Sequence, residues 1–214
     1  FFYENPISRF ARSIGLIIIL CVWMITLMST SATASPYLKP DNVTSTFSDN
    51  SSYSRLLTQG IDYYQKGLYE KARLIFTNLS TISPDDPIVQ YYLGLTSYML
   101  GDLTSAERAF DVAVHQNVSP DALFYYGATL YGLKNFSGSF DAYEQYVRIF
   151  PNDSYALFNL GQAYEQAGQY NSALIAYQKA TEIDPRYAKP WFFIGGLYES
   201  FGDYQKAADS YRYY

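Results

Sequence analysis

The sequence contains few of the residues that carry most catalytic and metal chemistry. Its 214 residues include one cysteine, Cys21, and one histidine, His115. A single thiol cannot form a disulfide framework, and a histidine with no second histidine or cysteine partner is a poor basis for a metal site. The glycines recur at regular intervals and form no phosphate-binding loop. We therefore expect no catalytic residues, no metal and no cofactor, and interpret the chain as not being an enzyme.

Charged residues are also scarce, at 16% of the chain, and they sum to a net charge of −5. With 49% hydrophobic residues, this composition excludes a wholly disordered chain or a long coiled coil. The negative balance argues against nucleic acid as a partner, because phosphate binding needs a surplus of Lys and Arg. Tyrosine is abundant instead, with 24 copies. Its large apolar ring and polar tip suit binding surfaces as well as cores.

The first 34 residues have the pattern of an export or anchor segment. Arg9 and Arg12 precede an apolar run over residues 14–28, and a short Ala-x-Ala pattern follows. These are the three parts of a signal peptide, although an uncleaved membrane anchor also fits the run. Both alternatives place the rest of the chain outside the cytoplasm, because the arginines stay on the cytoplasmic side. An uncleaved segment would contact the membrane through residues 14–34.

Residues 35–52 are rich in Ser, Thr, Asn, Asp and Pro without an apolar period, which predicts a polar linker. The chain also carries six Asn-x-Ser/Thr triplets, which can accept N-linked glycans in an exported protein. Asn78 falls inside an expected helix and is the poorest candidate. The candidate glycosylation sites are Asn42, Asn50, Asn117, Asn135 and Asn152. The alternative is an unmodified surface rich in Ser and Thr.

From Tyr53 onward the sequence repeats itself with a period of about 34 residues. The clearest copy, residues 154–187, contains Leu157, Leu160, Gly161, Tyr164, Gly168, Tyr170, Ala173, Tyr177, Ala180 and Pro185. These residues match the signature of the tetratricopeptide repeat (TPR) family, which this segment closely resembles. Four further copies keep the same phase: residues 53–86, 87–119, 120–153 and the partial copy 188–214.

The resemblance implies an all-α fold, a right-handed α-solenoid of about five helix–turn–helix repeats over residues 53–214, preceded by an N-terminal hydrophobic helix. Small residues at unit positions 8 and 20 are expected where the two helices of a unit press together. Glycines between the helices suit a left-handed turn, and prolines end the second helix. Because the fifth unit is truncated and a solenoid needs a polar cap, we expect the natural chain to continue beyond Tyr214.

In the TPR family the first helix of each unit lines a concave groove through unit positions 2, 5, 9 and 12. The resemblance assigns partner binding to Tyr64, Tyr91, Tyr98, Phe124, Tyr131, Tyr155, Phe158, Gln162 and Phe192. Leu95 and Asp121 occupy two more of these positions. The Lys and Asn residues that grip chaperone tails are missing from this set. We expect a partly apolar, extended polypeptide in the groove; alternatively, the rings pack on one another or on a C-terminal helix.

The function that follows is a protein-interaction scaffold outside the cytoplasm that helps to assemble a complex. One alternative is that the repeats recruit substrates for a larger membrane enzyme such as a glycosyltransferase. Another is carbohydrate binding, because aromatic faces stack on sugars.

Overall fold

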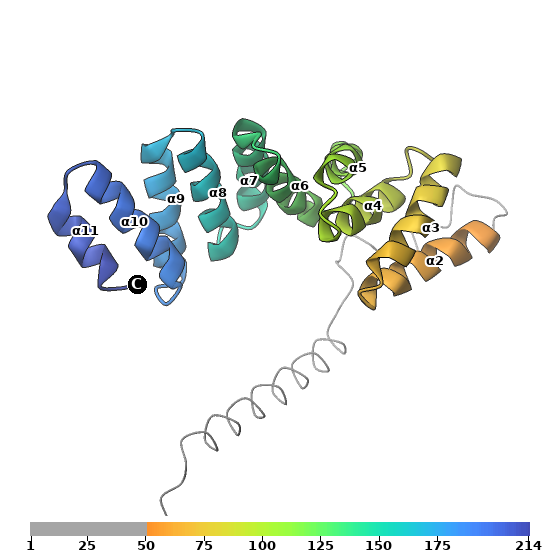
Figure 1. Cartoon of the computed structure of the whole chain (residues 1–214), viewed down its shortest axis with the longest axis horizontal. Coiled ribbons are helices and arrows are strands. Elements are labelled where there is room, and N and C mark those ends of the chain that lie inside the picture. The colour runs from red at the N-terminus through yellow and green to blue at the C-terminus, as the bar shows by residue number, and fades with distance from the viewer. Residues whose placement is uncertain (1–50) are drawn as a thin grey trace, which may run out of the picture. The chain divides into compact units, whose positions relative to one another are not determined.

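The computed structural model describes residues 51–214 as a row of helix pairs (Figure 1). The expected N-terminal hydrophobic segment, residues 1–34, lies outside the described residues, as do Asn42 and Asn50. The helices are α2 (Ser51–Gln65), α3 (Tyr69–Ile82), α4 (Pro87–Met99), α5 (Leu103–His115), α6 (Pro120–Gly132), α7 (Phe136–Ile149), α8 (Ser154–Gln166), α9 (Tyr170–Ile183), α10 (Ala188–Ser200) and α11 (Tyr204–Tyr211). The expected all-α solenoid of five units is confirmed.

The first helix begins slightly earlier than the sequence predicted. Residues 51 and 52, assigned to the polar linker, are the first two residues of α2. The apolar period could not reveal them, because both are serines and the period begins at Tyr53. No helix within residues 51–214 has the length and apolar character needed to cross a membrane.

Each unit consists of a helix A (α2, α4, α6, α8 or α10) and a helix B (α3, α5, α7, α9 or α11). Helix A packs on helix B of its own unit, and helix B packs on helix A of the next unit. In addition, successive A helices touch one another from α2 to α8, while no pair of B helices within residues 51–214 makes comparable contact. Closer spacing of the A helices is what the inner face of a curved solenoid requires.

A glycine at unit position 8 and an aromatic ring at position 24 form the central contact of every unit. A methyl group added to the glycine would lie 2.4–3.1 Å from the nearest ring atom. The pairs are Gly60–Phe76, Gly94–Phe110, Gly127–Tyr143, Gly161–Tyr177 and Gly195–Tyr211. The small residue expected at this position is therefore confirmed, and the group that occupies its space is a side chain of helix B.

The small residue at position 20 also lies in the A–B interface. It is alanine in four units, and each alanine is almost entirely buried. The third unit carries Ser139 instead, and its hydroxyl donates a 2.8 Å hydrogen bond to the carbonyl oxygen of Gly127. The buried hydroxyl is thus satisfied by the facing helix, which removes the desolvation cost that an unpaired hydroxyl would carry.

Left-handed residues join the two helices of each unit, as the glycine pattern predicted. Gly67, Gly101, Gly168 and Gly202 have φ values of 72–81°. The third unit has Lys134 at the same place, with φ 62°. A lysine there bears the steric cost of the left-handed region, about 1–2 kcal/mol, which glycine avoids.

Sequence signals also mark the ends of the helices. Pro84, Pro151 and Pro185 each follow the last residue of a B helix by two positions. The acidic residues of the loops act mainly as caps: Asp86 accepts hydrogen bonds from the Ile88 and Val89 amides, and Asp153 accepts one from the Ala156 amide. These bonds satisfy amide groups that the helix itself leaves free.

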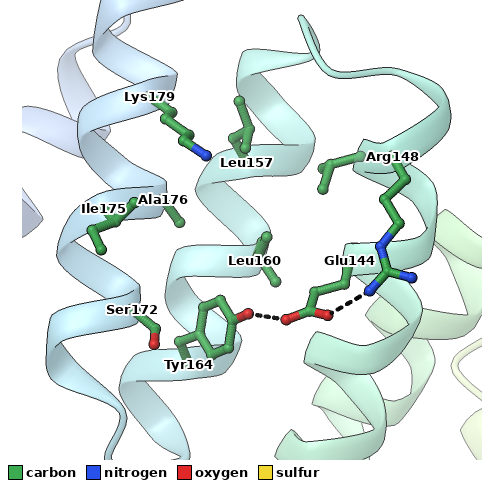
Figure 2. Close-up of a pocket in the computed structure, with 10 residues that line it drawn as sticks. Glu144, Arg148, Leu157, Leu160, Tyr164, Ser172, Ile175, Ala176 and Lys179 are labelled. Atoms are coloured by element: carbon green, nitrogen blue, oxygen red, sulfur yellow. Dashed lines mark hydrogen bonds and ion pairs between the residues drawn. The ribbon is translucent and has the colours of Figure 1, made fainter.

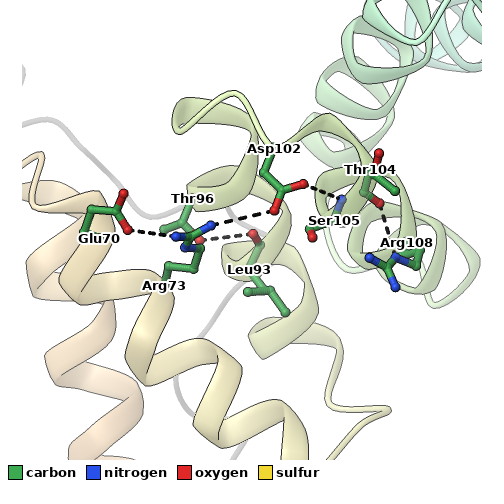
Figure 3. Close-up of polar contacts among 8 residues, drawn as sticks. All are labelled: Glu70, Arg73, Leu93, Thr96, Asp102, Thr104, Ser105 and Arg108. Atoms are coloured by element: carbon green, nitrogen blue, oxygen red, sulfur yellow. Dashed lines mark hydrogen bonds and ion pairs between the residues drawn. The ribbon is translucent and has the colours of Figure 1, made fainter.

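Polar contacts tie the first unit to the second (Figure 3). The Arg73 guanidinium on α3 lies 3.0 Å from Glu70 and 3.7 Å from Asp102 of the next unit. Asp102 also accepts a hydrogen bond from the Ser105 amide. That hydrogen bond, helped by the nearby arginines, holds the pKa of the Asp102 carboxyl below its usual value. Because the contact is exposed, it contributes less to stability than the buried core.

The glycine–ring contact predicts opposite effects for two alanine substitutions. In Gly161→Ala the new methyl would lie 2.5 Å from the Tyr177 ring, which is completely buried and has no room to move. We expect a loss of about 1–3 kcal/mol in the free energy of unfolding.

The matched control is Gly196→Ala, whose methyl would meet only the Tyr211 hydroxyl at 3.8 Å. This variant should gain up to about 1 kcal/mol from helix propensity. Urea unfolding followed by circular dichroism measures both changes. A Gly161→Ala variant as stable as the parent would contradict the packing described.

Candidate functional site

The face formed by the A helices contains a pocket of about 450 Å³, here called the A-face pocket. It spans the first four units, because α2, α4, α6, α7 and α8 all contribute to its wall. Its lining is Tyr64, Tyr91, Tyr92, Leu95, Asp121, Phe124, Tyr125, Tyr146, Asp153 and Tyr155. Seven of these ten residues are aromatic, so the pocket is an apolar recess edged by hydroxyl and carboxyl groups.

The structure brings together four of the nine predicted groove residues in this pocket: Tyr64, Tyr91, Phe124 and Tyr155. Leu95 and Asp121, at two further groove positions, join them. The remaining five predicted residues, Tyr98, Tyr131, Phe158, Gln162 and Phe192, do not line it.

The predicted residues also differ in how much surface they offer. Tyr155 and Phe192 are exposed, at 54% and 48%. Tyr91 and Phe158 are buried, at 8% and 4%, and the other five are half-buried. The predicted groove positions on the A helices thus carry both exposed rings and buried rings.

Phe158 belongs to the core. Its ring lies 5.4–5.7 Å from those of Tyr177, Tyr187 and Phe193, measured between centroids. Two of these neighbours come from α9 and α10, so Phe158 joins consecutive units. None of these three neighbours stands at a groove position, so Phe158 packs into the core between units rather than on other groove rings.

Phe124 lines the A-face pocket and packs against four other rings. Its ring centroid lies 5.3–5.8 Å from those of Tyr125, Tyr143, Tyr146 and Tyr155, which come from three different helices. Aromatic contacts at such distances add to the effect of burial. The floor of the pocket is therefore fixed by packing before any partner arrives.

Sequence reasoning missed four lining residues: Tyr92, Tyr125, Tyr146 and Asp153. Tyr92 and Tyr125 stand at unit position 6, directly after a groove aromatic, so the repeated aromatic doublet was the available signal. Tyr146 occupies position 27, where the second and fourth units have alanine. Its departure from that pattern could have marked it as unusual. Asp153 lies outside the groove positions of the repeat signature, so no sequence signal pointed to it.

The charges in the pocket have one sign. Among residues 51–214, Asp121 and Asp153 are the only ionisable groups that line it apart from the tyrosines, and no lysine or arginine of this range does so. Asp153 is engaged: one carboxylate oxygen caps α8, and the other accepts a 3.1 Å hydrogen bond from the Tyr146 hydroxyl. Although Asp121 as a residue is exposed, desolvation by its surroundings raises the pKa of its carboxyl group.

The opposite side of the solenoid has hollows of another kind. One of about 320 Å³ lies between α7 and α9 and is floored by α8 (Figure 2). Glu144 spans its edge, accepting a hydrogen bond from the Tyr164 hydroxyl and pairing with Arg148 at 3.2 Å. Similar hollows lie between α3 and α5 and between α9 and α11. Because they recur at junctions of consecutive B helices, they are a consequence of the repeat rather than a distinct site.

The remaining candidate residues have ordinary surroundings. His115 is exposed, and its Nδ1 lies 2.7 Å from the carbonyl oxygen of Asp111 within the same helix. Within residues 51–214 no three histidine, cysteine or acidic side chains gather as a metal site would require. Asn117, Asn135 and Asn152 are all exposed, and Asn135 also caps α7 by accepting a hydrogen bond from the Gly138 amide.

Comparison with known proteins agrees with this architecture. Residues 57–122, 101–154 and 154–187 match the tetratricopeptide repeat family. Together with the five helix pairs, these matches show that the chain belongs to that family, whose repeats form protein-interaction scaffolds. No curated protein matches the sequence.

Several solved structures share the fold. MamA from Desulfovibrio magneticus RS-1 is 23% identical, with a TM-score of 0.70 over 77% of this chain and 94% of that chain. YrrB, described as a TPR protein with an unusual peptide-binding site, is 18% identical, with a TM-score of 0.69 over 74% of this chain and 82% of its own. At these identities the likeness concerns the fold alone.

The structure predicts that two neighbouring groove aromatics respond differently to truncation. Phe158→Ala removes a ring that is 4% exposed, so the free energy of unfolding should fall by about 3–5 kcal/mol. Tyr155→Ala removes a ring that is 54% exposed and should cost about 1 kcal/mol or less. Chemical unfolding of both variants measures the difference, and equal losses would contradict the assignment of Phe158 to the core and Tyr155 to the surface.

Proposed function

We propose that the A-face pocket holds an extended segment of a partner polypeptide, and that the protein uses it to assemble a complex outside the cytoplasm. The observation that carries the proposal is the pocket itself, an aromatic recess that crosses four consecutive units. Exposed aromatic rings backed by a packed floor resemble the anchors that dominate protein interfaces.

The dimensions of the face favour an extended peptide over a compact ligand. Neighbouring packed helices lie about 8–10 Å apart, so the three steps from α2 to α8 cover roughly 30 Å. An extended chain advances about 3.3 Å per residue, and roughly nine residues would span this distance. YrrB, a protein with the same fold, is described as having a peptide-binding site.

Photo-crosslinking tests the position of the partner. We expect p-benzoylphenylalanine at Tyr155, an exposed ring in the pocket, to crosslink to a polypeptide in the native source. The same substitution at Tyr204 is the control, because Tyr204 is 71% exposed but lies on helix B of the fifth unit. Crosslinking from Tyr204 and not from Tyr155 would place the binding surface elsewhere and refute the proposal.

The location outside the cytoplasm rests on the sequence of residues 1–34 and on the Asn-x-Ser/Thr triplets. Asn117, Asn135 and Asn152 are exposed in the structure, which leaves them accessible to a glycosyltransferase. Protein from a glycosylating native source should lose mass when treated with an N-glycosidase. Protease treatment of intact cells or organelles gives a second readout: repeats protected in the same way as a cytoplasmic marker would contradict export.

A further inference from the structure

We infer that the A-face pocket selects a partner segment bearing a lysine or arginine, whose cationic group is held between Asp121 and the surrounding tyrosine rings. This inference rests on the proposed function and adds to it the chemistry of the bound segment. It reverses the arrangement of TPR proteins that grip chaperone tails, in which basic residues hold a carboxylate.

The first support is that the two carboxylates of the pocket have no basic partner within residues 51–214. Asp62, Asp203 and Asp209 each form an ion pair with a lysine or arginine three or four residues away, whereas other aspartates outside the pocket, such as Asp85 and Asp141, form none in that range. Among residues 51–214 no ion pair includes Asp121 or Asp153, although both face one pocket. The pocket therefore presents two carboxylates that no lysine or arginine within residues 51–214 pairs with.

Asp121 is the more available of the two carboxylates. Both oxygens of Asp153 already accept hydrogen bonds, one from the Ala156 amide and one from the Tyr146 hydroxyl. The Asp121 side chain accepts no hydrogen bond from any residue in the range 51–214, since only its backbone amide is engaged, with Ser119. Asp121 can therefore pair directly with a ligand, while Asp153 adds negative potential.

The second support is the aromatic wall. The faces of tyrosine rings attract cations by about 0.5–2 kcal/mol, more when water is excluded. Tyr155 exposes 54% of its surface, and Tyr64 and Tyr125 lie in the same lining. Arginine and lysine also carry apolar stems that can cover such rings while the charged end reaches a carboxylate.

The Asp121 carboxylate and the tyrosine rings also determine which partner segments should bind weakly. An uncharged apolar segment would remove water from Asp121 without replacing its hydrogen bonds, and that desolvation is costly. An acidic segment would add repulsion from both aspartates. A basic residue compensates Asp121 and uses the ring faces, so the pocket discriminates by charge as well as by shape.

The test is selection of random 12-residue peptides displayed on phage against the full 214-residue chain, held in a mild nonionic detergent. We expect the recovered peptides to be enriched in Lys and Arg relative to the input library. The most enriched peptide is then synthesised, and its affinity is measured for the parent and for two variants. Asp121→Asn keeps the shape of the side chain but removes its charge, and Asp85→Asn makes the same change at an exposed loop residue outside the pocket.

We expect Asp121→Asn to weaken binding about 10- to 100-fold, the effect of losing a hydrogen bond to a charged group, and Asp85→Asn to leave it unchanged. Replacing the basic residue of the peptide by glutamine should give a similar loss with the parent and little further loss with Asp121→Asn. Such non-additivity identifies the two groups as a direct pair.

The possible failures are distinguishable. Peptides that bind through the pocket, with loss of affinity in Tyr155→Ala, but without Lys or Arg enrichment and without sensitivity to Asp121→Asn, would overturn the cation inference and leave peptide binding standing. Recovery of no binding peptide at all would overturn both the inference and the proposed function.

Discussion

The contact between a glycine on helix A and an aromatic ring on helix B is the interaction on which the rest of the structure depends. It recurs in all five units, always sixteen residues apart in the chain, for example between Gly94 and Phe110. The ring fills the space that a side chain on helix A would have taken, so the two helices approach closely and bury the ring. With each unit fixed in this way, stacking of the units determines the position of every groove residue.

The same contact explains why the A-face pocket can be aromatic. The large rings at position 24 pack in the A–B interfaces, where Phe76, Phe110 and Tyr177 are completely buried from solvent. The rings at positions 5 and 6 of helix A form a second aromatic set. These rings contact neighbouring units and line the inner face of the solenoid. Phe124 belongs to this set, and its contacts on three helices give the pocket a packed floor.

Periodicity in the sequence predicted the helix pairs, the left-handed turns and the glycine contacts, because each depends on spacing within one unit. Only part of the lining of the A-face pocket could be predicted from the sequence. Whether a groove ring is exposed like Tyr155 or buried like Phe158 depends in part on the neighbouring unit, which supplies Phe193 in the second case. Tyr146 was missed for another reason: its ring reaches the pocket from helix B, whereas the groove positions of the signature all lie on helix A. Contacts between units are set by three-dimensional stacking, which a repeat signature does not encode.

The central claim is that a partner binds along the A helices of the first four units. Hydrogen–deuterium exchange of the full chain, with and without its bound polypeptide, tests it most directly. The account predicts slower exchange in α2, α4, α6 and α8 on binding, with little change in α3, α5 and α9, B helices that do not line the pocket. Slower exchange confined to the B helices, or spread evenly over the solenoid, would contradict it.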